Sequence, residues 1–232
     1  MKICVLGDIH GNAYALSAVL DAAKKQEAEC LLITGDLVGY YFMPNEVINL
    51  IRPWKKYIVR GNHEDMLLEA RNNAAVLPEI EQRYGSAISV ALNTLNQDDL
   101  DTLCNLPHPL DIEIDGMKIL LCHGTPWDND VYVYPDAKED LISKCAMQEY
   151  DVVILGHTHY PMLKQVGKTQ LINPGSVGQP RNRQPGAQWA MLDTDSRQIT
   201  LHNKSYNLEP LLTDIKLRHP ELPYLTDVLT RT

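Results

Sequence analysis

The sequence has no Cys-x-x-Cys pair, and its five cysteines are odd in number. A disulfide framework and a zinc ribbon both need paired cysteines, so neither is indicated. No apolar run approaches the length of a membrane-spanning helix, and the apolar stretch before Asp8 is too short for a secretory signal. We therefore expect a cytoplasmic protein with buried free thiols and no membrane partner.

An excess of positive charge is also absent, because the formal net charge is −9. Binding to long nucleic acids depends on clustered Lys and Arg, so such a partner is not expected. Segments of low complexity are missing too, and the hydrophobic share of 44% and the charged share of 22% are ordinary for a globular protein. The length suits one large α/β domain or two small ones, and we favour a single domain over residues 1–232.

A Gly-x-Gly-x-x-Gly motif is missing after the first predicted strand, where the chain reads Gly-Asp-Ile-His-Gly-Asn. A nicotinamide cofactor is therefore not expected. Three short apolar runs, at 2–7, 30–34 and 56–60, are typical of buried strands. The segments between them, 13–27 and 44–51, have helical periodicity, so the first part of the chain is predicted to be βαβαβ.

From Glu64 to about Pro109 the composition changes to helix formers. We predict a helical insertion there, with helices near Asp65–Asn73, Pro78–Leu95 and Asp98–Leu103. The chain then returns to strands, which are predicted at Leu110–Ile114, Met117–Cys122 and Asp151–Leu155, with one more helix near Lys138–Gln148. Four further strands are expected to be antiparallel: Met162–Val166, Thr169–Ile172, Gln188–Asp193 and Gln198–Lys204. Residues beyond Asn207 are expected to pack as a tail on the body.

Polar side chains cluster at the points where predicted strands end. Asp8 and His10 follow the first strand, and in an extended backbone two such side chains point to the same side, toward a possible ion. By itself an Asp-x-His pair more often belongs to a turn. However, ligands in open α/β sheets bind at the carboxyl ends of strands. The clusters at five strand ends contain five of the eight histidines and together predict a metal site: Asp8 and His10, Asp36, Asn62 and His63, His123, and His157 and His159.

In this order and spacing, five motifs resemble those of the calcineurin-like metallophosphoesterase superfamily: Asp8-Ile9-His10, Gly35-Asp36, Gly61-Asn62-His63-Glu64, His123-Gly124 and Gly156-His157-Thr158-His159. The Asn173–Arg181 segment resembles that of the small prokaryotic branch of phosphodiesterases and phosphatases. The resemblance implies an α/β fold with a layered β-sandwich core flanked by helices. It also implies a hydrolase that cleaves a small phosphate ester with two divalent ions, through in-line attack by a bridging hydroxide.

The resemblance further implies seven metal ligands, with one ion held by Asp8, His10 and His159, the other by Asn62, His123 and His157, and both by Asp36. His157 and His159 must then diverge, although they are two residues apart. This set of nitrogen and oxygen ligands suits manganese, iron, zinc, cobalt or nickel. Two divalent ions, two aspartates and a hydroxide leave a net charge of about +1, which attracts phosphate.

His63 follows a predicted ligand, and we assign it the role of general acid that protonates the leaving oxygen. The alternative is that His63 only orients Asn62 or the phosphate. Arg181 and Arg183 are either substrate ligands or ordinary surface arginines. The loop after His123 contains three aromatic residues that either line a pocket or cover the insertion: Trp127, Tyr132 and Tyr134.

Several departures bear on the substrate. Arg60–Glu64 matches the protein serine/threonine phosphatases, but Gly35–Tyr40 lacks the arginine of their Gly-Asp-x-Val-Asp-Arg-Gly motif. Pro161 stands where a metallo-β-lactamase needs an acid, which argues against that class. We therefore favour a phosphodiesterase over a phosphomonoesterase or protein phosphatase. A binding scaffold without metals is a remote alternative, because all seven ligand positions are filled.

Overall fold

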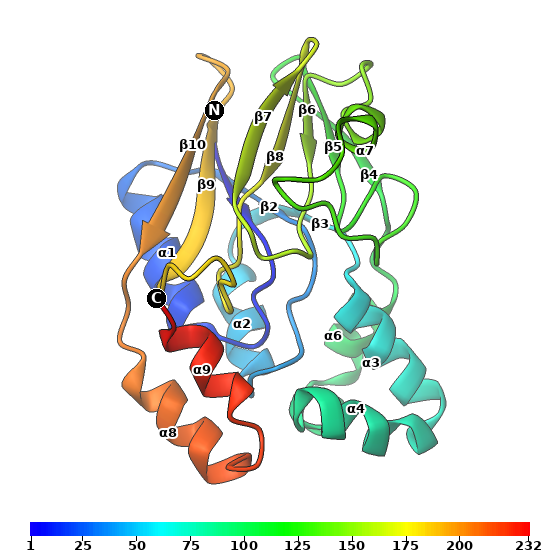
Figure 1. The fold of residues 1–232 in the computed structure, drawn as a ribbon, viewed down its shortest axis with the longest axis vertical. Helices are drawn as coiled ribbons and strands as arrows, with labels where there is room; N and C mark the ends of the chain where they lie inside the picture. Colours follow the sequence, from blue (N-terminus) through cyan, green and yellow to red (C-terminus); the bar gives the residue numbers. More distant parts are fainter.

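The computed structural model describes residues 1–232, which form two five-stranded sheets packed face to face with helices on their outer sides (Figure 1). The first sheet has the order β10-β9-β1-β2-β3 and consists of β1 (Lys2–Leu6), β2 (Cys30–Ile33), β3 (Lys55–Ile58), β9 (Ala187–Asp193) and β10 (Gln198–Lys204). The second has the order β4-β5-β6-β8-β7 and consists of β4 (Leu110–Ile114), β5 (Met117–Leu121), β6 (Val152–Ile154), β7 (Met162–Val166) and β8 (Thr169–Asn173). The predicted α/β class with a β-sandwich core is confirmed.

Strand β1 lies at the centre of the first sheet and is buried on both faces. Ile3 and Val5 pack between the two sheets, whereas Cys4 and Leu6 pack against the helices. A strand that is covered on both sides reads as a continuous apolar run rather than an alternating one. Each fully buried large aliphatic side chain contributes about 1.5–3 kcal/mol, so this arrangement fixes the strand firmly.

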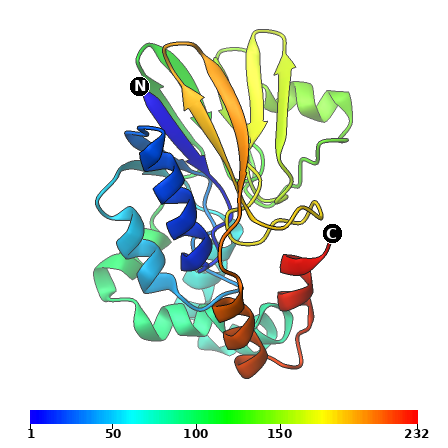
Figure 2. The same cartoon turned by 90° about the vertical axis from the view of Figure 1, so that its left-hand side faces the viewer.

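Helices α1 (Ala13–Lys25) and α2 (Pro44–Ile51) cover the outer face of the first sheet, and α7 (Glu139–Cys145) covers the second (Figure 2). Helix α1 begins where predicted, because the Asn12 side chain accepts a hydrogen bond from the backbone N–H of Ala15. Strand β2 pairs in parallel with both β1 and β3, so the predicted βαβαβ unit is present.

The helical region contains α3 (Asn62–Asn72), a 3₁₀ turn (Ala74–Val76), α4 (Leu77–Tyr84), α5 (Ala87–Thr94) and α6 (Gln97–Cys104). The single helix predicted over Pro78–Leu95 is wrong, since Gly85 with φ +78° ends α4 and a new helix follows. Helix α3 also begins three residues earlier than predicted, because the Glu64 carboxylate accepts a hydrogen bond from the Gly61 backbone N–H at 2.9 Å and so caps the first turn. The limits of the insertion, about 64–109, and of the domain, 1–232, stay predictions.

The hairpins β7–β8 and β9–β10 are antiparallel as predicted, but they belong to different sheets. Strand β8 is also parallel to β6, and β9 pairs with β1. The tail forms α8 (Glu209–Arg218) and α9 (Tyr224–Thr230), which pack on Tyr40, Tyr41 and Phe42. No helix combines the length and the apolar composition that crossing a membrane requires.

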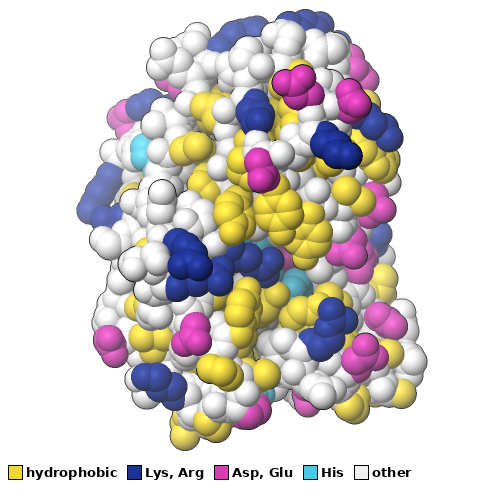
Figure 3. Space-filling model, in the orientation of Figure 1, with side chains coloured by type: hydrophobic (Ala, Val, Ile, Leu, Met, Phe, Trp, Pro, Cys, Tyr) yellow, Lys and Arg dark blue, Asp and Glu magenta, His cyan; other side chains and the backbone are white.

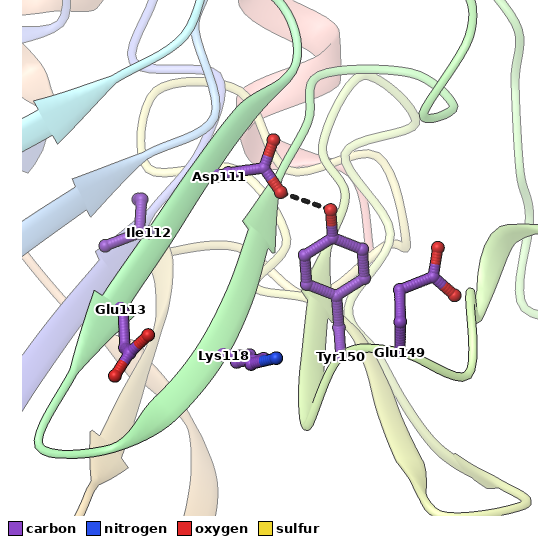
Figure 4. A pocket seen from close by; sticks show the side chains of 6 residues that line it. All are labelled: Asp111, Ile112, Glu113, Lys118, Glu149 and Tyr150. Carbon is purple, nitrogen blue, oxygen red and sulfur yellow. Dashed lines mark hydrogen bonds between the residues drawn. The ribbon is translucent and has the colours of Figure 1, made fainter.

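Strand β4 is an outer strand of the second sheet and carries charged side chains on its exposed face. Figure 4 shows the hollow beside it, where the Tyr150 hydroxyl donates a hydrogen bond to Asp111 and where Glu113 and Lys118 lie nearby. Charged residues on an edge strand oppose pairing with another chain. None of the predicted site residues lines this hollow, and we assign it no chemistry.

Candidate metal centre

All the predicted ligands follow strand ends, and the packing of the two sheets brings them together. Their donor atoms form two buried groups that share one residue. Asp8, His10, Asp36 and His159 make up the first group, and Asp36, His123 and His157 make up the second. Within each group the donor atoms lie within 4.8 Å of one another. The convergence predicted from five separate strand ends is therefore present.

In the first group, His10 Nε2 lies 3.1 Å from His159 Nε2 and 3.6 Å from Asp36 Oδ2. Asp8 Oδ1 lies 3.5 Å from the same nitrogen of His159. Ligands bound at about 2.0–2.2 Å to one ion stand about this far apart. The other oxygen of Asp8, Oδ2, is buried without a hydrogen-bond partner, which is rare unless a cation balances it.

In the second group, His123 Nε2 lies at the centre. It is 3.2 Å from His157 Nδ1, 3.0 Å from Asn62 Oδ1 and 3.4 Å from Asp36 Oδ2. The same Asp36 oxygen is thus close to a histidine of each group. This position between the groups is the one that a bridging carboxylate needs.

Each of the four histidines uses its second ring nitrogen to donate to a backbone carbonyl. The acceptors are Val38 for His10 (3.1 Å), Thr34 for His123 (2.6 Å), Asp130 for His157 (3.1 Å) and Gln179 for His159 (2.6 Å). A carbonyl only accepts, so the nitrogen facing it carries the proton. The nitrogens that face the centre are therefore unprotonated in the neutral rings, as metal ligands must be.

Two pairs of unprotonated nitrogens consequently face each other. His10 and His159 do so at 3.1 Å, and His123 and His157 do so at 3.2 Å. Two lone pairs at this distance repel unless a cation lies between or beside them. The donor set of buried imidazoles and carboxylates thus fits divalent metal ions.

The backbone produces this geometry in a way that the sequence reasoning missed. Asp8 and His10 were expected to converge from an extended backbone, but this explanation is wrong: both residues are left-handed, with φ +52° and +51°. His157 and His159 are also left-handed, with φ +66° and +59°. The two rings diverge as the prediction required, because His157 presents Nδ1 to one group and His159 presents Nε2 to the other.

Glu64 is a fully buried carboxylate that the sequence reasoning did not single out. Its oxygens accept hydrogen bonds from the backbone N–H groups of Asp36 (2.7 Å), Leu37 (2.8 Å) and Gly61 (2.9 Å). Glu64 therefore joins the loop after β2 to the start of α3. Its position three residues after Gly61, as in a capping box, was the available signal.

His63 lies beside the first group and not in it. Its backbone N–H donates to Asp36 Oδ1 at 2.9 Å, while its buried Nδ1 has no hydrogen-bond partner. The ring packs against Tyr40 and Tyr84, with centroids 4.9 and 5.3 Å away. Gly39 makes room for it, since a Cβ there would lie 2.1 Å from Nδ1. His63 thus lines the cavity beside the donor groups without belonging to either of them.

The two candidate arginines separate clearly. Arg181 lines the small cavity at the centre, donates to the Tyr40 hydroxyl at 3.0 Å and also bonds Gln179. Arg183 is exposed and donates to the carbonyl of Thr232. Arg181 therefore stays a candidate substrate ligand, and Arg183 is a surface arginine.

The same cavity is lined by three tyrosines. Tyr132 was predicted either to line a pocket or to cover the insertion, and it lines the pocket. The bulk expected near the site from Tyr40–Pro44 is present as Tyr40, whereas Tyr84, in the helical insertion, carried no signal that would have placed it there.

Burial changes the protonation of the site side chains. It raises the pKa of Asp8 to about 8 and raises that of Asp36 well above its usual value. It lowers the pKa of His157 to about 4 and that of His63 to about 3. All these shifts favour neutral forms. A divalent cation would reverse this for the aspartates and keep the histidines neutral.

Comparison with known proteins agrees with this geometry. The calcineurin-like phosphoesterase superfamily domain matches residues 1–197. The uncharacterised protein MJ0912 of Methanocaldococcus jannaschii is 30% identical, with 94% of each chain covered, and the phosphodiesterase YfcE of Escherichia coli is 26% identical over 88% of this chain and 93% of its own. A solved structure of a hypothetical protein, PH1004 from Pyrococcus horikoshii, shares the fold with a TM-score of 0.85 and 22% identity, covering 99% of this chain and 98% of its own. The chain therefore belongs to the calcineurin-like phosphoesterase superfamily and is a metal-dependent hydrolase of phosphate esters.

Proposed function

We propose that this protein hydrolyses phosphodiesters at a centre of two divalent transition-metal ions. One ion is held by Asp8, His10 and His159, and the other by Asn62, His123 and His157, with Asp36 contributing to both. The observation that supports two ions is the presence of two separate pairs of facing, unprotonated histidine nitrogens, 3.1 and 3.2 Å apart. One cation can relieve only one of these repulsions.

Two bound ions would supply Lewis acidity, which would lower the pKa of a water molecule toward ~7 and balance charge on the phosphoryl oxygens of the substrate. Manganese, iron, zinc, cobalt and nickel all suit the nitrogen and oxygen donors, and the five cysteines lie elsewhere in the core. The chain's own part is to hold the donors rigidly. Their partners on Thr34, Val38, Asp130 and Gln179 do this.

His63 is the general acid of this proposal. Its ring lines the cavity, and because Nδ1 is buried against Gly39, Nε2 is the nitrogen available to a leaving oxygen. The backbone of the same residue is bonded to Asp36 Oδ1, which ties the position of the acid to that of the shared ligand. Because burial lowers the pKa of His63 to about 3, the ring in this proposal gains its proton when the phosphate anion binds beside it. A protonated imidazole that then gives this proton to the leaving oxygen contributes typically 10²–10⁴-fold.

Arg181 is the phosphate ligand. It provides the one guanidinium among the residues that line the cavity, and the Tyr40 hydroxyl and Gln179 orient it. A phosphodiester carries one negative charge, whereas a monoester carries up to two. A site with one arginine suits the diester better, and the phosphodiesterase relative from Escherichia coli supports the same choice. The substrate in this proposal is a small phosphorylated molecule.

The test has two parts. The metal-loaded protein should contain two ions per chain by mass spectrometry, and should hydrolyse the diester bis-nitrophenyl phosphate faster than the monoesters nitrophenyl phosphate and a phosphopeptide. Faster hydrolysis of the monoester or the phosphopeptide would favour the phosphomonoesterase or the protein phosphatase. A protein without bound metal and without turnover in added manganese would instead be a scaffold, and the proposal would be wrong.

A further inference from the structure

Exposed aromatic side chains gather beside the candidate centre. Aromatic residues make up 6% of the chain, yet Trp127, Tyr132 and Tyr134 lie within one short loop and are 45%, 43% and 39% exposed. Figure 3 shows hydrophobic side chains together in the middle of this face, next to arginine or lysine and histidine atoms. Large exposed apolar side chains that lie together commonly mark a binding surface.

The loop directs two of these side chains outward by simple alternation. Val133, between Tyr132 and Tyr134, is 2% exposed and packs in the core under the second sheet. In an extended segment, residues two apart point to the same side. Val133 therefore anchors the loop, and Tyr132 and Tyr134 project together on the opposite side.

The two tyrosines form an ordered stack that begins at the metal centre. The Tyr132 ring centroid lies 3.9 Å from that of His157, and the Tyr132 and Tyr134 rings are nearly parallel, at 10° and 5.7 Å. Tyr160 meets the Tyr134 ring edge to face at 5.5 Å. A row of rings held in this way keeps its shape, so its exposed surface is preformed for a ligand.

The row also borders the cavity in which the phosphate is proposed to bind. Tyr132 lines the same cavity as His63 and Arg181, so a phosphate at the centre is next to it. Neither Tyr132 nor Tyr134 belongs to a hydrophobic core cluster, which means that packing does not account for them. An exposed aromatic surface beside a phosphate site fits an ester that carries a planar ring.

We propose that Tyr132 and Tyr134 form a specificity subsite that packs against a planar aromatic group on the alcohol side of the scissile ester. This inference rests on the proposed function, because it places the phosphate at the metal centre. The aromatic group is a nucleobase or a simple aryl ring. Base stacking on an aromatic side chain contributes about 1–3 kcal/mol, which corresponds to roughly 5- to 150-fold in kcat/KM or in affinity.

Matched pairs of esters test the subsite. The first pair is adenosine 5′-(methyl phosphate) and ribose 5-(methyl phosphate), and the second is benzyl methyl phosphate and cyclohexylmethyl methyl phosphate. Within each pair the scissile bond is the same and only the planar ring is lost. We expect the metal-loaded protein to prefer the aromatic member at least 5-fold in one or both pairs. Preference in the first pair alone indicates a nucleobase, and preference in both indicates any aryl ring.

The variants separate the subsite from general damage. The Tyr134 side chain does not touch a predicted metal ligand. Tyr134→Ala should therefore reduce the preference for the aromatic member toward 1 while leaving kcat/KM for the ribose ester unchanged. Tyr132→Ala should also reduce the preference, together with the rate on both members of a pair, because the Tyr132 ring packs on His157 and lines the cavity; Tyr132→Phe should restore the preference. Tyr14→Ala is the matched control, because Tyr14 is 38% exposed on α1 and should keep the preference. Metal content is measured in each variant.

A binding measurement gives a second readout without turnover. The dissociation constants of adenosine 5′-phosphate and ribose 5-phosphate are compared by calorimetry, and the wild type should bind the nucleotide at least 5-fold more tightly, a difference that Tyr134→Ala abolishes. The inference would be overturned if the aromatic and non-aromatic members had equal kcat/KM values and equal dissociation constants. In that case hydrolysis of the ribose ester would still support the proposed function. A protein that hydrolyses no ester but binds the nucleotide through Tyr134 would overturn the proposed function alone.

Discussion

At the scale of single residues, the centre is built on a strained backbone. Five of the seven predicted ligands, all except Asn62 and His123, have φ between +51° and +66°. For an L-residue other than glycine this conformation costs about 1–2 kcal/mol. Such strain concentrates at functional sites, where the surrounding structure enforces it. Here it turns each side chain back toward the centre directly after its strand.

The position of Asp36 between the two groups gives a prediction about ion number. Asp36→Asn should disturb both ions, because one carboxylate oxygen lies 3.6 Å from His10 Nε2 and 3.4 Å from His123 Nε2. His10→Ala should weaken mainly one. Metal content per chain after gel filtration checks this, and equal loss of both ions from the two variants would contradict the division of ligands.

His63 gives a prediction about the leaving group. His63→Ala should keep its metals, because the ring is in neither donor group, yet should lose roughly 10²–10⁴ in kcat on alkyl esters, whose leaving oxygen needs a proton. Nitrophenyl esters should be affected much less. His202→Gln, at a histidine stacked on Trp189, is the control. Unchanged turnover of alkyl esters by His63→Ala would remove the general-acid role, and loss of metal would make His63 a ligand.

At the scale of elements, the loop after β2 and the first turn of α3 behave as one unit. The Glu64 carboxylate accepts hydrogen bonds from backbone N–H groups of both segments, and the Asp36 side chain accepts a hydrogen bond from the His63 backbone N–H. Gly61 allows the close approach, since a Cβ there would lie 2.2 Å from Asp36 Oδ1. The helix cap therefore positions the shared metal ligand.

Glu64→Gln should break this unit without changing the side chain's size. The glutamine amide has one accepting oxygen, so at least one of the three backbone N–H groups loses its partner, at about 1–3 kcal/mol. We expect Tm to fall by about 2–4 °C per kcal/mol and metal affinity to fall 10- to 100-fold. Thermal unfolding and metal titration measure both. A variant with wild-type values for both would show that Glu64 does not position Asp36.

At the scale of the whole molecule, residues far apart in the chain close the site. Tyr41 donates to the carbonyl of Leu225 in α9 and accepts from Gln179, whose own carbonyl holds His159. The C-terminal helices lie beyond residues 1–197, the part that matches the superfamily domain. The tail thus braces the loop after β2 and the segment before β9.

The buried site also predicts how pH affects the metal-free protein. Burial lowers the pKa of His63 to about 3 and of His157 to about 4, so the unfolded chain binds more protons below pH ~6.5 and stability falls on acidification. Burial raises the pKa of Asp8 from 3.8 to about 8, so between these values the folded chain holds a proton that the unfolded chain has lost. Stability therefore falls as pH rises toward 8 and levels off above it.

In chelator, Tm should therefore be highest near pH 6.5, where the loss caused by the histidines ends, and should fall on both sides, with the alkaline fall levelling off near pH 8. Added manganese should remove the loss on the alkaline side, because an ion stabilises ionised Asp8, and should raise Tm at pH 7.5. Unfolding scans at several pH values, with and without metal, measure these effects. A metal-free Tm that rises steadily from pH 6 to 9 would contradict the assignment of buried, neutral aspartates.

Much of this protein was decided by local sequence. The apolar runs set the strands, Asn12 set the start of α1, and short polar clusters marked the strand ends at which Asp8, Asp36 and His123 meet. These features could be predicted because they depend on neighbours in the chain. The helical spacing of apolar residues continues on both sides of Gly85, and for that reason it predicted one helix where there are two.

Only the tertiary structure decided the chemistry of the centre. Which nitrogen each histidine presents depends on carbonyls 20 to 89 residues away, such as Thr34 for His123 and Gln179 for His159. The left-handed turns, the role of Glu64 and the tyrosines that line the cavity likewise depend on contacts between distant segments. Sequence alone determined which residues gather at the strand ends, whereas the packing of two sheets determined how they face one another, because orientation is set by partners that the linear pattern does not contain.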